Sequence, residues 1–260
     1  MNLTAGKVSL VTGSSGIAAA TAAALAAEGS AVYVVGIDAD DVEKLVATVA
    51  SSDTPVLGRV ADLRFVDQTE AAFDACLAEF GRLDNVVAIA GGSGRRHGDG
   101  PIDEMSQDAW DATLEMNLTP VMTTARSAVR AMRPSGGSLV IVSSVLALYP
   151  APERFGTHAY AAAKGAALTL VRSLAASYLD CSVRVNAVLP AVTDTPMAAR
   201  VAGDDGILSY LERKQPLTGG MLDAADVANV ISFLCSDGAR AITGQTIAVD
   251  GGWSVASVDG

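Results

Sequence analysis

The sequence predicts an α/β fold in which a parallel sheet of about seven strands is doubly wound, with helices on both of its faces. Short apolar runs rich in β-branched residues alternate with helical patterns along the whole chain. The runs are apolar at nearly every position, as expected of strands buried on both faces of a parallel sheet. No Pro-, Gly- or Ser-rich linker interrupts the alternation, so residues 1–260 are expected to form a single domain.

The predicted strands are the apolar runs themselves, at Lys7–Val11, Ala31–Val35, Pro55–Val60, Leu83–Ile89, Gly137–Val142, Ser182–Val188 and Gln245–Val249. Helical patterns separate them at Gly16–Glu28, Asp40–Ala50, Asp67–Phe80, Gln107–Met132, Thr157–Tyr178 and Ala224–Cys235. Because crossovers between parallel strands are right-handed, this order covers both faces of the sheet.

Three longer irregular stretches lie outside these elements, at Gly91–Pro101, Leu146–His158 and Met197–Met221. Sheets of this kind bind ligands beyond the carboxyl ends of their strands. The first two stretches follow strands directly, so we expect them to rim a pocket there. The third is rich in glycine, and we expect residues 197–221 to act as a mobile lid.

Charge and composition exclude several classes of protein. The net charge of −11 disfavours nucleic acid and anionic membranes as partners. The alanine-rich run Ile17–Ala27 is too short to cross a bilayer, and the N-terminus lacks the pattern of a signal peptide. Cys76, Cys181 and Cys235 show neither a CxxC motif nor metal-ligand spacing. We therefore expect a cytoplasmic protein without a metal.

A glycine-containing turn follows the first predicted strand, in the segment Thr12-Gly13-Ser14-Ser15-Gly16-Ile17. Glycines there permit a tight turn and let backbone N–H groups reach a pyrophosphate at the start of the next helix. A plain strand–turn–helix corner would use the same glycines. Its position after the first strand favours binding of a dinucleotide.

The end of the second strand indicates which dinucleotide is bound. An acidic residue there accepts hydrogen bonds from ribose hydroxyls, whereas a basic one meets a 2′-phosphate. The strand ends in Gly36-Ile37-Asp38, two more aspartates follow, and no basic residue occurs before Lys44. NAD is therefore favoured, with NADP possible. Asp38 would either bind the ribose or cap the next helix, and Asp62-Leu63 would contact the adenine.

Tyr160 and Lys164 lie one helical turn apart, so both side chains are expected on the same face of the helix. An adjacent ammonium favours the phenolate and lowers the pKa of the tyrosine toward the working range of an acid–base catalyst. An ordinary surface pair has the same spacing. Ser144, at the end of a predicted strand just upstream, favours a reactive site.

Further motifs accompany this pair: Thr12-Gly13, Gly16-Ile17, Asp62, Ala90-Gly91, Asn117, Arg184-Val185-Asn186-Ala187, Pro190, Thr195-Pro196-Met197, Thr243-Gly244-Gln245 and Asp250-Gly251-Gly252. With them the chain resembles the classical short-chain dehydrogenase/reductase family over about residues 5 to 253. The resemblance implies a Rossmann-like fold and an oxidoreductase that transfers hydride between a nicotinamide cofactor and a secondary alcohol or ketone.

The resemblance also implies four catalytic roles. Tyr160 would be the general acid/base, and Lys164 would lower its pKa and hold the nicotinamide ribose. Ser144 would hydrogen-bond the reacting oxygen, and Asn117 would support a water that links Lys164 to solvent. The residues expected to bind the cofactor are Gly13, Ser14, Ser15, Gly16, Ile17, Asp38, Asp62, Leu63, Ala90, Gly91, Tyr160, Lys164, Pro190, Thr193 and Thr195.

The cofactor motifs depart from the family pattern. Only Ser14-Ser15 separate the first two glycines, where the family has three residues, and Gly36 replaces a common aspartate. Ala88-Ile89 replace two asparagines, and Ala191 replaces a glycine. Two functions therefore stay open: an active dehydrogenase/reductase, or a non-catalytic ligand-binding or scaffolding protein with an impaired cofactor site.

The segment between Ser144 and Tyr160 is apolar and partly aromatic, which suits a hydrophobic substrate unless these side chains only pack the loop. The cluster Arg95-Arg96-His97 would meet a carboxylate or the phosphates of an acyl carrier, or is simply solvated. The resemblance implies a homotetramer, with a dimer as the alternative, that pairs the helices Gln107–Met132 and Thr157–Tyr178 and the apolar end Trp253–Val258.

Overall fold

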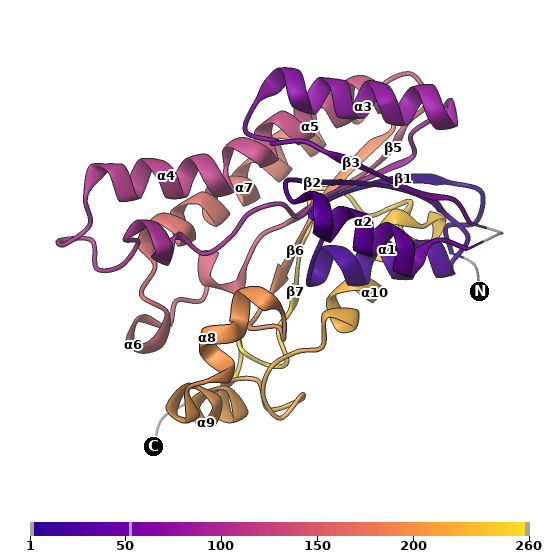
Figure 1. Ribbon diagram of the computed structural model, residues 1–260. Coiled ribbons are helices and arrows are strands. Elements are labelled where there is room, and N and C mark those ends of the chain that lie inside the picture. Colours follow the sequence, from indigo (N-terminus) through magenta and orange to yellow (C-terminus); the bar gives the residue numbers. More distant parts are fainter. Residues whose placement is uncertain (1–2, 52–53, 258–260) are drawn as a thin grey trace.

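Seven parallel strands form one sheet within residues 3–51 and 54–257, which the computed structural model describes. The strand order is β3-β2-β1-β4-β5-β6-β7 (Figure 1). The strands are β1 (Val8–Thr12), β2 (Ala31–Gly36), β3 (Val56–Val60), β4 (Asn85–Ala88), β5 (Gly137–Val142), β6 (Val183–Pro190) and β7 (Thr246–Val249). The predicted α/β class and the doubly wound parallel sheet are confirmed.

Helices cover both faces of this sheet. On one face lie α1 (Ile17–Ala27), α2 (Ala39–Val49) and α10 (Ala224–Cys235), and α1 packs against α10. On the other lie α3 (Val66–Phe80), α4 (Gln107–Asn117), α5 (Thr119–Met132) and α7 (His158–Ser177). Short helices follow the carboxyl ends of β5 and β6: α6 (Pro152–Phe155), α8 (Ala199–Ala202) and α9 (Asp205–Lys214). In the described part of the chain no helix is both long and apolar enough to span a membrane.

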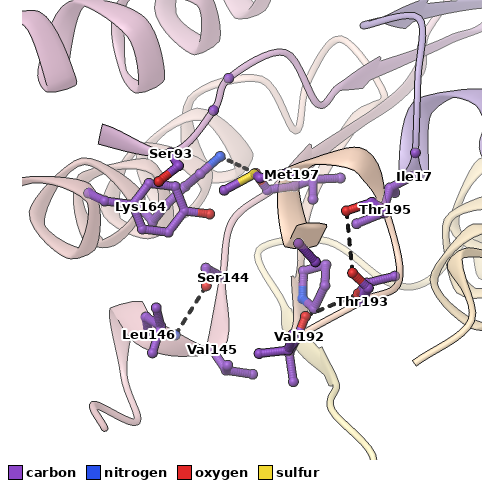
Figure 2. Close-up of a pocket in the computed structure, with 18 of the residues that line it drawn as sticks. Ile17, Ser93, Ser144, Val145, Leu146, Lys164, Val192, Thr193, Thr195 and Met197 are labelled. Carbon is purple, nitrogen blue, oxygen red and sulfur yellow. Dashed lines mark hydrogen bonds between the residues drawn. The ribbon is translucent and has the colours of Figure 1, made fainter. Parts of the chain in front are cut away.

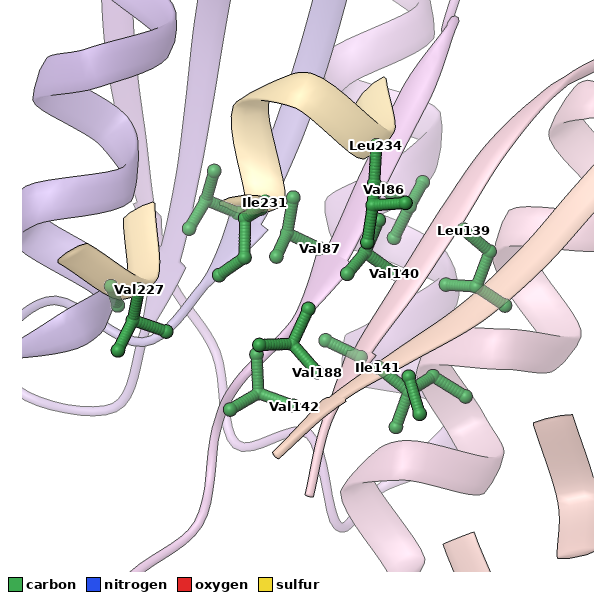
Figure 3. Close-up of a cluster of buried hydrophobic side chains, with 14 of the residues drawn as sticks. Val86, Val87, Leu139, Val140, Ile141, Val142, Val188, Val227, Ile231 and Leu234 are labelled. Atoms are coloured by element: carbon green, nitrogen blue, oxygen red, sulfur yellow. The ribbon is translucent and has the colours of Figure 1, made fainter. Parts of the chain in front are cut away.

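The core lies on both sides of the central strands (Figure 3). Successive residues of β5 point to opposite faces, so a run such as Leu139, Val140 and Ile141 is buried throughout. Ile231 and Leu234 of α10 close the core on one side. Burying each such side chain contributes about 1.5–3 kcal/mol, and this holds the strand ends that carry the site in place.

One predicted helix was wrong, because Gln107–Met132 is divided into α4 and α5 at Leu118. Pro120 occupies the first turn of α5. Its ring lacks an N–H and crowds the preceding turn, so a helix tends to restart there. The break leaves Asn117 as the last residue of α4, beside the loop that follows β4.

The segment from Met197 to Met221 is also less irregular than predicted. It contains α8 and α9, and α9 buries Ile207, Tyr210 and Leu211 at helical spacing. Asp204 caps α9 by accepting a hydrogen bond from the N–H of Ile207 at 3.0 Å. Movement of residues 197–221 as a lid stays a prediction. Of the predicted apolar end Trp253–Val258, Val258 lies outside the described residues.

Candidate active site

A cavity of about 260 Å³ opens beyond the carboxyl ends of β1, β4, β5 and β6 (Figure 2). The strand order reverses between β1 and β4, which is where doubly wound sheets bind their ligands. The predicted site residues that line it are Ser15, Gly16, Ile17, Gly91, Ser144, Tyr160, Lys164, Pro190, Thr193 and Thr195. Residues from four strand ends and from α7 therefore meet in one place.

Tyr160 and Lys164 lie on the same face of α7, as predicted from their spacing. The Nζ atom of Lys164 is 5.7 Å from the centroid of the Tyr160 ring. It donates a hydrogen bond to the carbonyl of Val142 at 3.0 Å, at the end of β5. Only 4% of Lys164 is exposed, and burial lowers its pKa to about 8.

The pKa of Tyr160 differs from the expectation of a lowered value. Burial raises it to about 12, and a hydrogen bond with Ser144 opposes this rise. The lysine does not offset the burial, because its ammonium is itself destabilised and is directed to the Val142 carbonyl. In the protein alone, the phenol is therefore the stable form of Tyr160.

The serine pair joins β5 to α7. Ser144 begins the 3-10 turn η2 (Val145–Ala147), where its hydroxyl accepts a hydrogen bond from the N–H of Leu146 at 3.2 Å. The hydroxyl of Ser143 donates to the carbonyl of Lys164 at 2.8 Å. The Ser143 bond fixes the end of β5 against α7, the Ser144 bond caps η2, and the Ser144 hydroxyl lies at the cavity beside Tyr160.

Asn117 is fully buried and does not line the cavity. Its Oδ1 atom accepts a hydrogen bond from the N–H of Gly92 at 3.0 Å, and its Nδ2 atom donates to the carbonyl of Thr113. Gly91 has a φ of 158°, and a Cβ there would lie 2.8 Å from Asn117 Oδ1. Asn117 thus supports the backbone that forms the cavity wall beside Lys164.

The turn after β1 forms a cradle at the start of α1. Gly16 has a φ of 54°, and a Cβ there would lie 2.9 Å from the side chain of Thr195. No side chain of the described residues caps the N-terminus of α1, so the positive end of the helix is available to an anionic ligand, although the N–H of Ala18 donates to the carbonyl of Ser15 at 3.1 Å. The donors and the glycine-lined approach fit the pyrophosphate of a dinucleotide.

Two residues that the sequence reasoning missed hold this site together. Gln215 is fully buried and brackets Val192, accepting from its N–H at 3.1 Å and donating to its carbonyl at 3.0 Å. It thereby fixes the Pro190–Thr195 loop. Asp99, from the loop after β4, accepts hydrogen bonds from the first N–H groups of α7. Neither residue belongs to a local motif, so no signal in the sequence indicated them.

Aromatic side chains form the wall opposite the turn after β1. Phe155 and the fully buried Trp253 line the cavity, with ring centroids 5.7 Å apart. Leu146 also lines it, as the sequence predicted for this segment. Leu148 and Tyr149 are exposed and lie outside the lining, because η2 turns the chain away there.

Comparison with known proteins identifies the family of the chain. A family model described as "Enoyl-(Acyl carrier protein) reductase" matches residues 11–254. A solved short-chain type dehydrogenase/reductase from Mycobacterium ulcerans is 33% identical, with a TM-score of 0.90 over 97% of this chain and 91% of that chain. The chain belongs to the short-chain dehydrogenase/reductase family.

Two relatives of this short-chain dehydrogenase/reductase act on ring alcohols by name. Cis-4-hydroxycyclohexanecarboxylate dehydrogenase of Sinomonas cyclohexanicum is 36% identical over 95% of this chain and 96% of that protein. 2,5-Dichloro-2,5-cyclohexadiene-1,4-diol dehydrogenase LinX of Sphingobium indicum is 31% identical over 98% of both. The protein is thus an NAD(P)-dependent oxidoreductase that acts on alcohol or ketone substrates.

On the adenosine side of this dehydrogenase/reductase, the structure shows Asp38 in the capping role that was one of its two predicted alternatives, and cofactor binding by this region stays a prediction. Asp38 caps α2 by accepting from the N–H of Asp41 at 3.0 Å. The carboxylate of Asp62 pairs with Arg64 at 2.6 Å, which lowers its pKa. Leu63 is buried in the core. The expected cofactor residues outside the cavity lining are Gly13, Ser14, Asp38, Asp62, Leu63 and Ala90.

The packing around Gly36 explains why no aspartate stands there. A Cβ at Gly36 would lie 2.8 Å from Ser14 Oγ and 2.7 Å from a methyl group of Val42. The side chains of Ser14 and Val42 occupy the space beside the end of β2. A side chain at position 36 would collide with it, so glycine fits there.

Of the basic cluster, only Arg95 lines the cavity. Arg96 contacts His97 and the sulfur of Met116 instead. The Nδ1–H of His158 donates a hydrogen bond to the carbonyl of Gly100 at 2.7 Å, and His158 lies outside the lining. Arg200 of α8, which the sequence reasoning missed, also lines the cavity.

Proposed function

We propose that this short-chain dehydrogenase/reductase interconverts a secondary alcohol on an apolar, ring-shaped body and the corresponding ketone, with Tyr160 as the general acid/base. The observation that carries the proposal is that Tyr160, Ser144 and Lys164 line one cavity beside the cradle at the start of α1. When bound, the nicotinamide supplies the acceptor or donor of hydride.

In this proposal each residue has one task. Tyr160 accepts the proton of the alcohol in the oxidative direction and returns it to the ketone oxygen in reduction. The Ser144 hydroxyl donates a hydrogen bond to that oxygen and stabilises charge that develops there. Lys164 does not lower the pKa of Tyr160 in the protein alone, but its ammonium would hold the nicotinamide ribose and would favour the phenolate once the cofactor and substrate are bound. Asn117 supports the wall behind it.

We favour NAD over NADP as the cofactor. Asp38, Asp40 and Asp41 are exposed at the end of β2 and the start of α2, where the 2′-phosphate of NADP would approach. Their charges would repel that phosphate. Thr193 and Thr195, on the loop bracketed by Gln215, would hold the carboxamide. Gly16 and Ile17 would hold the pyrophosphate.

A ring-shaped substrate is supported by two observations. The wall formed by Leu146, Phe155 and Trp253 is apolar, and its aromatic faces suit a flat or chair-shaped ring. The relatives named above act on cyclohexane and cyclohexadiene alcohols. As in the family pattern, we further propose a cytoplasmic homotetramer paired through α4, α5 and α7.

Titration with NAD, NADH, NADP and NADPH, followed by thermal unfolding, tests the proposal. We expect NAD and NADH to raise the melting temperature more than the phosphorylated pair. Cyclohexanol and cyclohexanone, followed by nicotinamide absorbance, then test the reaction. Absence of any thermal shift at about millimolar cofactor would overturn the enzyme proposal and favour a ligand-binding or scaffolding protein.

A further inference from the structure

We propose that Arg95 and Arg200 form a carboxylate-binding pair at the mouth of the cavity, so that the substrate is a ring alcohol or ketone that carries a carboxylate. This inference rests on the proposed function and names the substrate class of the same site. It assigns Arg95 and Arg200 as specificity residues that touch the substrate but not the reacting atoms.

The two arginines come from distant parts of the chain. Arg95 lies in the 3-10 turn η1 (Gly94–His97) after β4, and Arg200 lies in α8 after β6. Both line the cavity that holds Tyr160. The guanidinium groups are close enough to interact: partial burial and then the charge of Arg200 lower the pKa of Arg95, while Asp99 opposes them.

Neither arginine is neutralised within the described residues. No carboxylate oxygen of residues 3–51 or 54–257 lies within 4.0 Å of either guanidinium, whereas Arg64 and Arg82 pair with Asp62 and Asp84. Among the described residues, the Arg95 side chain donates a single hydrogen bond, to the carbonyl of Arg154 at 3.5 Å. The two positive charges of Arg95 and Arg200 therefore lie at the same cavity without a carboxylate of the described residues paired to either.

The carboxylate of Asp99, whose charge raises the pKa of Arg95, is already engaged in other hydrogen bonds. Both carboxylate oxygens of Asp99 accept hydrogen bonds from the backbone at the start of α7, at 3.0 and 2.9 Å. Asp99 therefore reduces the positive potential at Arg95 but does not form an ion pair with either arginine. The protein as a whole has a net charge of −11, so the positive charge at the cavity mouth is opposite in sign to that of the protein and attracts an anion there.

The chemistry of the cavity selects a carboxylate among anions. A guanidinium presents a planar fork of donors that matches the two oxygens of a carboxylate. The cavity of about 260 Å³ is lined on one side by the residues proposed to hold the cofactor, so only part of it is left for the substrate, and the apolar wall at Phe155 suits a small apolar body rather than a carrier-linked chain. A substrate held at both ends would present its carbinol to Tyr160 in a single orientation.

The test compares 4-oxocyclohexanecarboxylate with its carboxamide, which has nearly the same shape without the charge, in reduction with NADH. We expect the wild-type protein to prefer the acid in kcat/KM. Arg95→Ala and Arg200→Ala should each lower the ratio of acid to amide roughly tenfold or more, mainly through KM. Arg95→Lys should restore part of the ratio, because it keeps the charge but loses the fork.

Arg96→Ala is the matched control, because Arg96 lies in the same turn, carries the same charge and is outside the cavity lining. It should leave the ratio at the wild-type value. The ratio in the wild-type protein should also fall as salt is added, since the mouth is open to solvent.

A binding measurement separates this inference from the proposed function. Cyclohexanecarboxylate has no carbonyl to reduce, so its calorimetric binding does not depend on catalysis. Binding that exceeds that of cyclohexanecarboxamide, and that Arg95→Ala and Arg200→Ala weaken, supports the pair even if no ketone is reduced. Equal binding and equal turnover of acid and amide, or preference only for a coenzyme A thioester, would overturn it while ketone reduction still supported the proposed function.

Discussion

The carboxylate of Asp99 accepts a hydrogen bond from the backbone N–H of Tyr160 at 2.9 Å. Its second oxygen accepts from the N–H of Ala159 at 3.0 Å. The residue before α7, Thr157, makes no side-chain cap, so the helix is capped from a loop far away in the sequence. A negative charge at a helix N-terminus is also favourable to the helix dipole. Asp99 thereby fixes the turn that carries Tyr160.

Replacement of Asp99 should therefore affect both stability and turnover. We expect Asp99→Ala to lower the free energy of unfolding by about 1–2 kcal/mol, the usual loss on removing a helix cap. It should also lower kcat, because the first turn of α7 loosens around Tyr160. Asp103→Ala, at an exposed position of the same loop, is the control in urea denaturation and kinetics. An Asp99→Ala protein with wild-type kcat would contradict the positioning role.

Tyr160→Phe removes the group proposed to carry the proton and keeps the ring. We expect kcat to fall by roughly 10²–10⁴, the usual contribution of a general acid or base. The thermal shift with NADH should persist, since the cradle at Gly16 is unchanged. Tyr149→Phe, at a tyrosine outside the cavity lining, should keep its activity. Comparable activity of both variants would remove Tyr160 from the mechanism.

The buried ammonium of Lys164 should make stability depend on pH. Burial lowers its pKa from 10.5 to about 8, so between these values the unfolded chain binds more protons than the folded protein. The free energy of unfolding should therefore rise with pH across this window, and the gain is lost as pH falls toward 8. The total is on the order of 3 kcal/mol.

Urea denaturation of the wild-type protein and of Lys164→Met across this window measures the effect. Lys164→Met should show a flatter profile and greater stability below pH 8. The series should stay below pH 10, because the raised pKa of Tyr160 reverses the trend above its ordinary value of 10.0. Parallel profiles for the two proteins would mean that Lys164 is not the source.

Restoring the aspartate common in the family at position 36 should harm this protein. A Cβ at Gly36 meets Ser14 and Val42 at under 3 Å, so Gly36→Asp should lower the free energy of unfolding by about 1–3 kcal/mol. NAD affinity, measured by calorimetry, should fall with it. Gly203→Ala, where the added methyl meets only ordinary contacts, is the control. Tighter NAD binding by Gly36→Asp would show that the turn can move aside.

Local patterns in the sequence were enough to predict most of the fold. The bounds of Gly137–Val142 agree with those of β5, because a strand buried on both faces is apolar throughout. Signals for two missed features were present in the sequence. Pro120 marks the restart of the helix after Leu118, and Asp204 with Ile207, Tyr210 and Leu211 marks α9. Glycines around α9 concealed the second signal.

In the candidate site, too, local spacing was enough to predict some residues, whereas others are placed only by tertiary packing. Tyr160 and Lys164 could be predicted because one helix sets their separation, and Ser144 because a strand end sets its place. Gln215 and Arg200 reach the site through loops whose paths depend on tertiary packing, so no spacing in the sequence indicates them. The contact between Ser14 and Gly36 likewise joins two strand ends that only the folded sheet brings together.

The buried indole of Trp253 provides an intrinsic fluorescent probe of ligand binding in the cavity. Its ring borders the cavity and packs against Phe155, and its N–H donates to the carbonyl of Tyr149 at 3.1 Å, so a ligand that shifts Phe155 would change the environment of the indole. The chain has one other tryptophan, Trp110 of α4, which lies outside the lining. In a Trp110→Phe protein, fluorescence would report from Trp253 alone, and energy transfer to a reduced nicotinamide would make each arrival and departure visible during turnover.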